Sequence, residues 1–281
     1  MIELSNNSIP YFISDLHISH RTPKTLQAFE HWIATVSSPN SHIFILGDLF
    51  EIWFGDDYTD EVVQRTQSAF IHSKDAGSTL YFMQGNRDFL IGDTFCKQVG
   101  FKLLTDPDFI QINQHIILLT HGDQLCVDDQ DYQRFRHMTR SNNWIDNFLS
   151  QPLADRIELA NSIREHSERD KSHKKIEIMD ISQSAVNNAY LGHWPDGRLI
   201  GRSNVILHGH THRCAVHGLN QPGLINQSCH GKLHHQLRFV LPDWDFDYPK
   251  EKFNGGYLTI QHDGTFQLNL LHSSQLIELK S

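Results

Sequence analysis

The chain has 281 residues, of which 39% are apolar and 20% charged, and its net charge is −9 at pH 7. This composition is typical of a soluble globular protein, and the length allows one large domain with an insertion as readily as two domains. The negative charge argues against general nucleic-acid binding, which requires a basic surface. It does not exclude a phosphate substrate, because bound metal ions would supply local positive charge.

Targeting signals and disulfides are not indicated by the sequence. No basic segment is followed by an apolar one, so we expect no secretory signal. No apolar run approaches the roughly 18 residues of a membrane-spanning helix. The 4 cysteines form no C-x-x-C pair, which predicts free thiols in a reducing compartment.

Short apolar strands alternate with amphipathic helices over the first part of the chain. The sequence predicts strands at 9–14, 42–46, 79–84, 109–112 and 115–120, and helices at 24–36, 59–74 and 93–99. This alternation predicts an α/β (α+β) fold. In such folds ligands bind at the carboxyl ends of the strands.

Residues 125–200 differ, because their apolar side chains recur at helical spacing. Asp128 and Asp129 can cap the first helix of this segment. Its larger apolar side chains are Tyr132, Phe135, Trp144, Phe148 and Leu149. A polar stretch follows at 164–175, and helical spacing resumes at 176–189. We expect a helical insertion that forms a lid over the ligand edge. The alternative is that its aromatic side chains only pack it onto the core.

The chain after residue 200 returns to short strands. They are expected at 204–208, 236–241, 256–260 and 266–271, with turns at Asn254-Gly255 and Asp263-Gly264. We therefore divide the chain into a core, residues 1–124 and 201–281, and a lid insertion, residues 125–200. A polar loop at 228–235 contains His230, His234 and His235, and we assign these histidines no role.

Clusters of Asp, Asn and His directly follow five of the predicted strands. Singly, each has a plain explanation, such as a loop cap or a tight turn with a surface arginine. Their recurrence at successive strand ends favours one shared metal site. The candidate ligands are Asp15, His17, Asp48, Asn86, His121, His210 and His212. Nitrogen and oxygen donors without a thiolate favour Mn, Fe or Zn over a cysteine-type zinc site or Ca²⁺.

Asp48 is the candidate bridging ligand. Two divalent ions about 3.5–4 Å apart could share its carboxylate and activate a water for in-line attack on phosphorus. Arg87, next to Asn86, could add a fixed positive charge as the transition state develops. This chemistry predicts a two-metal phosphoesterase.

The five clusters, in this order, resemble the calcineurin-like metallophosphoesterases over residues 9–123 and 200–215. The resemblance implies a β-sandwich flanked by helices. It assigns one metal to Asp15, His17, Asp48 and His212, and the other to Asp48, Asn86, His121 and His210. Arg87 stands where that superfamily usually has a His that assists the leaving group, which argues against an ordinary phosphomonoesterase or nuclease role.

A more specific resemblance extends over nearly the whole chain, to the UDP-2,3-diacylglucosamine pyrophosphatase family of lipid A biosynthesis. Its motifs here are Gly85-Asn-Arg-Asp88, His121-Gly-Asp-x-Leu-Cys-x-Asp-Asp129, Tyr132-x-x-Phe135-Arg136, Ile178-Met-Asp180 and Gly209-His-Thr-His-Arg213. The family resemblance implies hydrolysis of UDP-2,3-diacylglucosamine to UMP and 2,3-diacylglucosamine 1-phosphate (lipid X), by water attack on the α-phosphorus.

The same family resemblance implies two Mn²⁺ per chain and a catalytic group of Arg87, Asp48 and His121. It implies peripheral attachment to the cytoplasmic face of the inner membrane. We expect a monomer, and the net charge argues against a nucleic-acid partner. The implied substrate contacts are Asn86, Arg87, Asp129, Ser167, Lys171, Lys174 and His210. Lys171 stands where the family has an Asn.

Two other functions are weighed against this one. The first is a two-metal enzyme that hydrolyses a nucleotide or a phosphodiester, which should tolerate replacement of Phe135 and Phe148 by Ala. The second is a metal-binding scaffold for protein interaction, which would normally have lost one or more ligands. Loss of turnover in a folded His121→Ala variant would exclude the scaffold.

Overall fold

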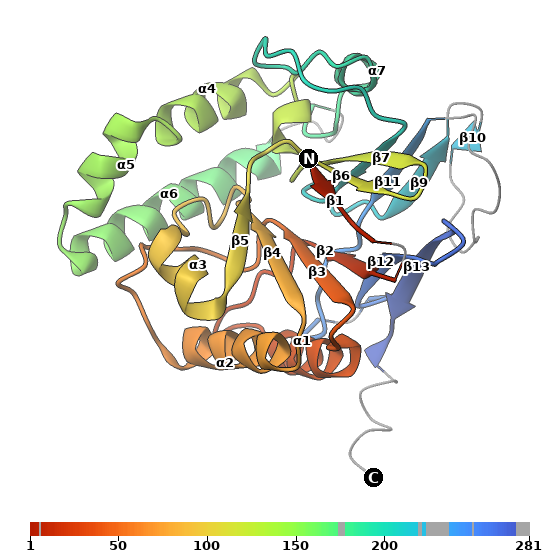
Figure 1. Ribbon diagram of the computed structural model, residues 1–281. Coiled ribbons are helices and arrows are strands. Elements are labelled where there is room, and N and C mark those ends of the chain that lie inside the picture. The colour runs from red at the N-terminus through yellow and green to blue at the C-terminus, as the bar shows by residue number, and fades with distance from the viewer. Residues whose placement is uncertain (6, 174–177, 219–220, 223–235, 249, 274–281) are drawn as a thin grey trace.

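Two facing β-sheets form the centre of the protein, and helices cover their outer sides (Figure 1). The structure is a computed structural model, and it describes residues 1–5, 7–173, 178–218, 221–222, 236–248 and 250–273. The side chains of 166–168, 170–173 and 221–222 are not described. The predicted α/β class, with a two-sheet sandwich flanked by helices, is confirmed.

The first sheet has the strand order β13-β12-β2-β3-β4-β5. Its strands are β2 (Ile9–Ile13), β3 (Ser41–Leu46), β4 (Thr79–Met83), β5 (Phe101–Leu104), β12 (Gly255–Ile260) and β13 (Phe266–Leu271). Strands β2 to β5 are parallel, and β12 joins β2 in antiparallel register. The carboxyl ends of β2, β3 and β4 therefore lie next to one another.

The second sheet has the strand order β1-β6-β7-β8-β11-β9-β10. Its strands are β1 (Ile2–Glu3), β6 (Asp108–Ile112), β7 (His115–Leu119), β8 (Val205–His208), β9 (Ala215–Gly218), β10 (Gln221–Pro222) and β11 (Leu237–Val240). Strands β7 and β8 are parallel, with Ile117 opposite Val205. Their carboxyl ends thus also point to one edge.

The helices pack outside these sheets. They are α1 (Pro23–Val36), α2 (Glu61–Asp75), α3 (Asp93–Val99), α4 (Gln130–Thr139), α5 (Asn142–Leu149), α6 (Leu153–His173) and α7 (Gln183–Tyr190), with a 3₁₀ turn at Asp123–Leu125. Helices α1 to α3 cover the first sheet, α7 covers the second, and α4 to α6 extend to one side (Figure 1).

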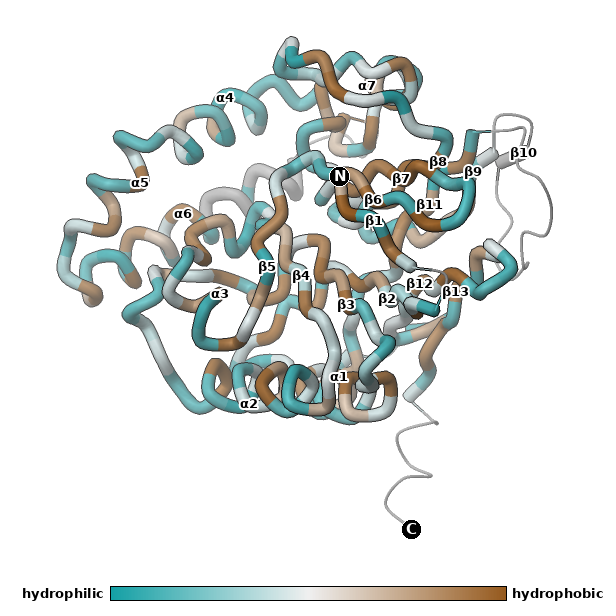
Figure 2. The backbone as a smooth tube through the Cα atoms, viewed as in Figure 1, coloured by the Kyte–Doolittle hydropathy of each residue, from teal (hydrophilic) through white to brown (hydrophobic). Residues whose placement is uncertain are grey.

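Three layers of apolar side chains hold this arrangement together. Between the sheets, Phe12 and Phe44 stack at 4.9 Å and pack against residues such as Ile117 and Leu207. A second layer lies between the first sheet and α1 to α3, and a third joins the second sheet to α7. The strands are accordingly hydrophobic along most of their length (Figure 2). Burial on both faces explains why the central strands β3, β4 and β8 are nearly continuous apolar runs.

Most predicted elements are present, with shifted ends. Helix α2 begins at Glu61 and not at 59, because the Asp60 side chain accepts a hydrogen bond from Val63 N at 2.7 Å. The predicted helix at 176–189 is wrong at its start. Residues 178–182 are not helical because Ser182 N donates to Leu125 O and Asp180 is paired with Arg213. Residues 174–177 lie outside the described part.

The predicted turn at Asn254-Gly255 is also wrong. Asn254 N donates to Leu271 O at 2.8 Å, and Gly255 opens β12. A Cβ at Gly255 would lie 3.0 Å from the Phe246 ring and 3.1 Å from Trp244, so close packing, not a turn, accounts for this glycine. The Asp263-Gly264 turn is confirmed, with φ of +84° at Gly264.

Several short elements were not predicted, namely β1, β5, β9, β10 and the 3₁₀ turn. Cys96, Cys126 and Cys214 are buried free thiols, as predicted, and Cys229 lies outside the described residues, as does the loop at 228–235. Within the described part, no helix combines the length and the apolar character needed to cross a lipid bilayer.

Candidate active site

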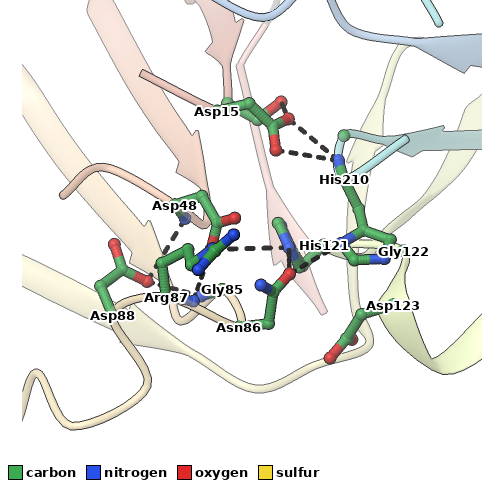
Figure 3. Close-up of polar contacts among 12 residues, drawn as sticks. Asp15, Asp48, Gly85, Asn86, Arg87, Asp88, His121, Gly122, Asp123 and His210 are labelled. Carbon is green, nitrogen blue, oxygen red and sulfur yellow. Dashed lines mark hydrogen bonds and ion pairs between the residues drawn. The ribbon is translucent and has the colours of Figure 1, made fainter. Parts of the chain in front are cut away.

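Seven candidate ligands come together where five strands end. Asp15 follows β2, Asp48 follows β3, and Asn86 follows β4 of the first sheet. From the second sheet, His121 follows β7 and His210 follows β8. Figure 3 shows these side chains converging on one small region between the two sheets. Parallel strands that share an edge explain how residues far apart in sequence meet there.

The first group of donor atoms contains Asp15, His17 and His212. The Nε2 atoms of the two histidines are 3.1 Å apart, and His212 Nε2 is 3.4 Å from Asp15 Oδ1. Asp48 Oδ2 lies 3.7 Å from His17 Nε2. Four side chains thus direct donor atoms at one point.

The second group shares Asp48 with the first. Its other oxygen, Oδ1, is 3.7 Å from His121 Nε2. Asn86 Oδ1 lies 2.9 Å from His121 Nε2 and 2.7 Å from His210 Nδ1. One Asp48 oxygen therefore faces each group, the arrangement that a bridging carboxylate requires.

The backbone at these residues is held in a conformation that L-amino acids avoid. The φ angles are positive at Asp15, His17, Asp48, His210 and His212, between 49° and 68°. Non-glycine residues in this region each cost of order 1 kcal/mol or more, and they cluster at functional sites. The fold stabilises an arrangement that these three loops would not adopt alone.

Glycines beside the ligands allow the loops to approach closely. A Cβ at Gly85 would lie 2.2 Å from Asp48 Oδ1, and one at Gly209 would lie 2.1 Å from Asp15 Oδ2. At Gly47, which has φ of +88°, the added atom would be 2.5 Å from His121 Nδ1. Any side chain at these positions would overlap one of the candidate metal-binding residues.

Three imidazoles of the site have a polar partner behind them. His121 Nδ1 donates to Leu46 O at 2.9 Å, which leaves Nε2 as the free donor to a metal. His17 Nδ1 lies 2.9 Å from Glu51 Oε2, and His212 Nδ1 lies 3.5 Å from Asp243 Oδ2. Such outer partners fix the ring orientation and raise the basicity of metal-binding histidines.

The electrostatics of the site favour a cation. Burial opposes a charged His121 ring, but the carboxylates of Asp48, Asp15 and Asp123 outweigh it and raise the pKa of His121 to about 9. Burial alone would raise the pKa of Asp15, yet His212 and the neighbouring histidines hold it well below its usual range. Acidic groups that stay ionised while buried suit a site for positive charge.

Two acidic residues of the site were missed by sequence reasoning. Asp88 is fully buried and accepts backbone N–H groups from Leu49 at 2.7 Å and Gly85 at 2.8 Å, so it joins the two ligand loops. Burial and the nearby Asp48 raise the pKa of Asp88 to about 6. The other residue is Glu51, which contacts His17. Their signal in the sequence is an acid two or three positions after a ligand.

Asp123 shows the same signal and connects the site to α4. It is buried, and its Oδ2 accepts from Tyr132 Oη at 2.6 Å and from Arg136 Nε at 2.8 Å. Arg140 Nη2 donates to Gly85 O at 2.8 Å, and its guanidinium lies over the Phe89 ring. Helix α4 is thereby attached to two of the ligand loops.

A pocket of about 830 Å³ extends from the ligand groups toward α4, α5 and α6. Asn86, His210 and His212 line one part, and the rings of Phe135, Trp144 and Phe148 line another. Arginine side chains lie between and around them, namely Arg87, Arg136, Arg140, Arg164, Arg169 and Arg213. The pocket therefore combines a ligand edge, positive charge and an aromatic surface.

The other residues predicted to contact substrate are placed as follows. Asp129 lines this pocket and caps α4 by accepting from Tyr132 N at 3.0 Å. The capping predicted at 128–129 is thus confirmed. The side chains of Ser167 and Lys171 are not described, and Lys174 lies outside the described residues. Leu149, one of the larger apolar side chains of the expected lid, does not line the pocket; its Cδ2 atom lies close to Gly55 instead.

The seven side chains fit divalent metal ions. In the part of the chain that the structure describes, ligating atoms of Asp15, His17 and His212 lie within 4.8 Å of one another, as do those of Asp15, Asp48 and His121. Imidazole nitrogens with carboxylate and amide oxygens suit transition metals such as Mn, Fe and Zn. These donors, of which Asp15, Asp48 and His121 are buried, constitute a candidate metal centre.

Known proteins support this class. The chain is 37% identical over 245 residues to a UDP-2,3-diacylglucosamine hydrolase of Aromatoleum aromaticum, covering 87% of this chain and 92% of that protein. It is 38% identical over 239 residues to the same hydrolase of Haemophilus influenzae, covering 85% and 91%. No family model matches the chain.

Among solved structures, the E. coli phosphoesterase YfcE aligns with 94% of this chain and 100% of its own, at 14% identity and a TM-score of 0.35. That likeness is too distant to carry an argument. Fold and site together define a metallophosphoesterase-type hydrolase. By its similarity to the proteins above, the chain belongs to the UDP-2,3-diacylglucosamine hydrolase family.

Proposed function

We propose that this protein hydrolyses the pyrophosphate bond of UDP-2,3-diacylglucosamine in lipid A biosynthesis. The products are UMP and 2,3-diacylglucosamine 1-phosphate. The observation that carries the proposal is the single pocket that joins the ligand groups to aromatic side chains of α4 and α5. A substrate with a diphosphate and two acyl chains requires both kinds of surface. Family membership supports the same substrate.

The proposed cofactor is a pair of Mn²⁺ ions. Asp15, His17, Asp48 and His212 would hold one, and Asp48, Asn86, His121 and His210 the other. When bound, two divalent ions activate water for attack and neutralise charge on the phosphoryl oxygens. The support for a shared site is that Asp48 presents one oxygen to each group. The mixed donor set suits Mn²⁺ among other ions.

The protein's own groups bind and orient the diphosphate. Arg87 lines the pocket beside Asn86, and its backbone N donates to Asp48 Oδ1 at 2.8 Å, which fixes the loop that carries both. Its guanidinium would stabilise negative charge that develops on the phosphoryl group. His121 and Asp48 act as catalytic ligands. In our proposal water attacks the α-phosphorus, so the new P–O bond is in UMP and the sugar phosphate leaves.

Residues 125–200 form the proposed lid over the core of 1–124 and 201–281. Phe135 and Trp144 give the acyl chains an apolar surface and exclude water. Trp144 and Phe148 stack at 5.0 Å with an interplanar angle of 12°, so the buried Phe148 ring supports the partly buried Trp144 ring. Further proposed substrate contacts are Asn86, Arg87, Asp129, Ser167, Lys171, Lys174 and His210.

We propose that the protein acts as a monomer on the cytoplasmic face of the inner membrane. A substrate with two acyl chains has to be collected from the membrane surface. Exposed apolar side chains of the lid, Met138 and Leu159 among them, could enter the interface. Nucleic acid is not a proposed partner, given the net charge of −9.

The test is turnover of purified protein on UDP-2,3-diacylglucosamine, before and after chelation and with Mn²⁺ restored. UDP-N-acetylglucosamine is the matched control, because it has the same diphosphate without acyl chains. We expect UMP and 2,3-diacylglucosamine 1-phosphate by mass spectrometry only with metal, and little turnover of the control. Hydrolysis of simple phosphodiesters without turnover of the lipid would move the function to another two-metal phosphoesterase. No turnover of any phosphoester would favour a scaffold.

A further inference from the structure

A single carboxylate, Glu51, contacts side chains from three separate parts of the chain. Its Oε2 lies 2.9 Å from His17 Nδ1. Its Oε1 lies 2.9 Å from Arg164 Nε and 4.0 Å from Arg87 Nη1. His17 belongs to the first ligand group, Arg87 follows Asn86, and Arg164 comes from α6. Glu51 therefore connects the ligand edge to the helical segment.

The contact with His17 bears on metal binding. A carboxylate behind an imidazole fixes which nitrogen points to the metal, and its loss typically weakens metal binding about 10- to 100-fold. Here Glu51 holds Nδ1 from behind, which leaves Nε2 directed at His212 and Asp48. The backbone at His17 is also strained, with φ of +49°, so the surrounding structure has to maintain its conformation.

The contacts with the arginines bear on substrate binding. Arg87 and Arg164 both line the pocket and both approach the same oxygen of Glu51. Two guanidinium groups so close would repel each other without a carboxylate between them. Glu51 is only 17% exposed, so water screens that repulsion weakly. The carboxylate thus makes possible a paired set of cations for an anionic ligand.

We propose that Glu51 is a positioning residue that couples helix α6 to metal binding at His17. Arg164 holds Glu51 in place, and Glu51 holds His17. Removing Arg164 should therefore weaken metal binding, although Arg164 is not a predicted ligand. By reciprocity, metal at this site should favour the pocket-side position of Arg164. The role in substrate binding rests on the proposed function, whereas the metal coupling does not.

The chain supplies a matched control. Arg156, also on α6, forms an ion pair with Asp57 and donates to Phe54 O at 2.6 Å. The Asp57–Arg156 pair joins the same helix to the core but touches no candidate ligand. Asp57→Asn and Glu51→Gln each remove one ion pair between α6 and the core. General loosening of α6 would make the two variants alike, and the proposed coupling would not.

The experiment is titration with Mn²⁺ alone, followed by the electron paramagnetic resonance signal of the free ion. In Glu51→Gln we expect the Mn²⁺ affinity of one of the two sites to fall about tenfold or more. In Arg164→Gln the same site should weaken about threefold to tenfold. The Mn²⁺ affinity of Asp57→Asn should equal that of the wild type within about twofold. Equal affinities in Arg164→Gln and Asp57→Asn would overturn the coupling, and wild-type affinity in Glu51→Gln would overturn the positioning role.

Two further measurements keep the result interpretable. Thermal unfolding of the metal-free variants identifies any that fail to fold, and Arg164→Gln tests the coupling from α6 if Glu51→Gln is one of these. With UDP-2,3-diacylglucosamine, both variants should raise KM, and their combination should have less effect than the product of the two. If the rise in KM of the double variant equalled the product of the two single effects, the coupling would be contradicted. A wild type without turnover would refute the proposed function, and the Mn²⁺ titration would still decide the inference.

Discussion

The ligand edge of the sheets and the helical segment 125–200 are built in opposite ways. At the edge, Asp15, Asp48 and His121 are buried, and the backbone of the first two is strained. In the helical segment, Phe135 is 37% exposed and Met138 50% exposed, although the buried Phe148 ring and several arginines attach the segment to the core. The edge is rigid and preformed, and the helices carry apolar surface that is open to a ligand.

This difference suggests a division of labour. Preformed donors lose little freedom when a metal binds, whereas an exposed apolar face can accommodate chains of varied shape. Changes at the edge should therefore affect chemistry and metal content. Changes in the helices should affect the choice and affinity of substrate.

The largest effect is expected at Asp48. Asp48→Ala should remove both metals and lower turnover by at least about a thousandfold, because both ligand groups share this carboxylate. Metal content by elemental analysis and turnover by UMP release are the measurements. His212→Ala, which belongs to one group only, should lose mainly one ion. Two ions retained in Asp48→Ala would refute the bridging role.

Two phenylalanines distinguish packing from substrate contact within the helices. Phe148 is 2% exposed and belongs to the main core cluster, so Phe148→Ala should cost about 3–5 kcal/mol of unfolding free energy. Phe135→Ala should cost less than about 1 kcal/mol but raise KM for the diacylated substrate about tenfold. Chemical unfolding and steady-state kinetics check this. An unchanged KM in Phe135→Ala would weaken the lid proposal.

Replacement of Arg87 tests whether its positive charge acts on the substrate and not on metal binding. Arg87→Ala should lower kcat about a hundredfold while metal content stays normal, the size of effect seen when one transition-state donor is lost. Arg87→Lys should recover part of the loss, because it restores charge without the planar fork. Unchanged turnover in Arg87→Ala would exclude the transition-state role.

A smaller effect is expected when one methyl group is added to the glycine that precedes His210. Gly209→Ala should cost about 1–3 kcal/mol of unfolding free energy, because its Cβ would overlap Asp15 and Ser14. Metal affinity should fall with it. Gly218→Ala in β9, with its nearest neighbour at 3.6 Å, should change stability by less than about 0.5 kcal/mol. Similar losses in both variants would contradict a special constraint at the edge.

The sequence was sufficient to predict the strands that carry the ligands. Each is an apolar run that ends in an Asp, Asn or His, so pattern and chemistry pointed to the same positions. The positions of the seven candidate ligands followed, because parallel strands bring their ends together. Residues typical of turns were a less reliable guide to turn positions. Asn254-Gly255 has the composition of a hairpin turn, yet Gly255 is needed because it packs closely against Trp244.

The outer partners of the site could not be predicted in the same way. Glu51, Asp88 and Asp123 are single acids with no periodic neighbours, and their partners come from distant segments, such as Arg164 for Glu51. The exposure of individual side chains in the helical segment 125–200 could not be predicted from the sequence either. Phe135 and Phe148 have the same side chain and helical spacing, but only one of them is buried. Such distinctions depend on tertiary contacts that local patterns do not contain.

The most direct test of the central claim is hydrolysis of UDP-2,3-diacylglucosamine with Mn²⁺ in ¹⁸O-labelled water, with both products analysed by mass spectrometry. Attack on the α-phosphorus by water activated at this edge predicts the label in UMP and none in the sugar phosphate. Label in 2,3-diacylglucosamine 1-phosphate would contradict the proposed direction of attack.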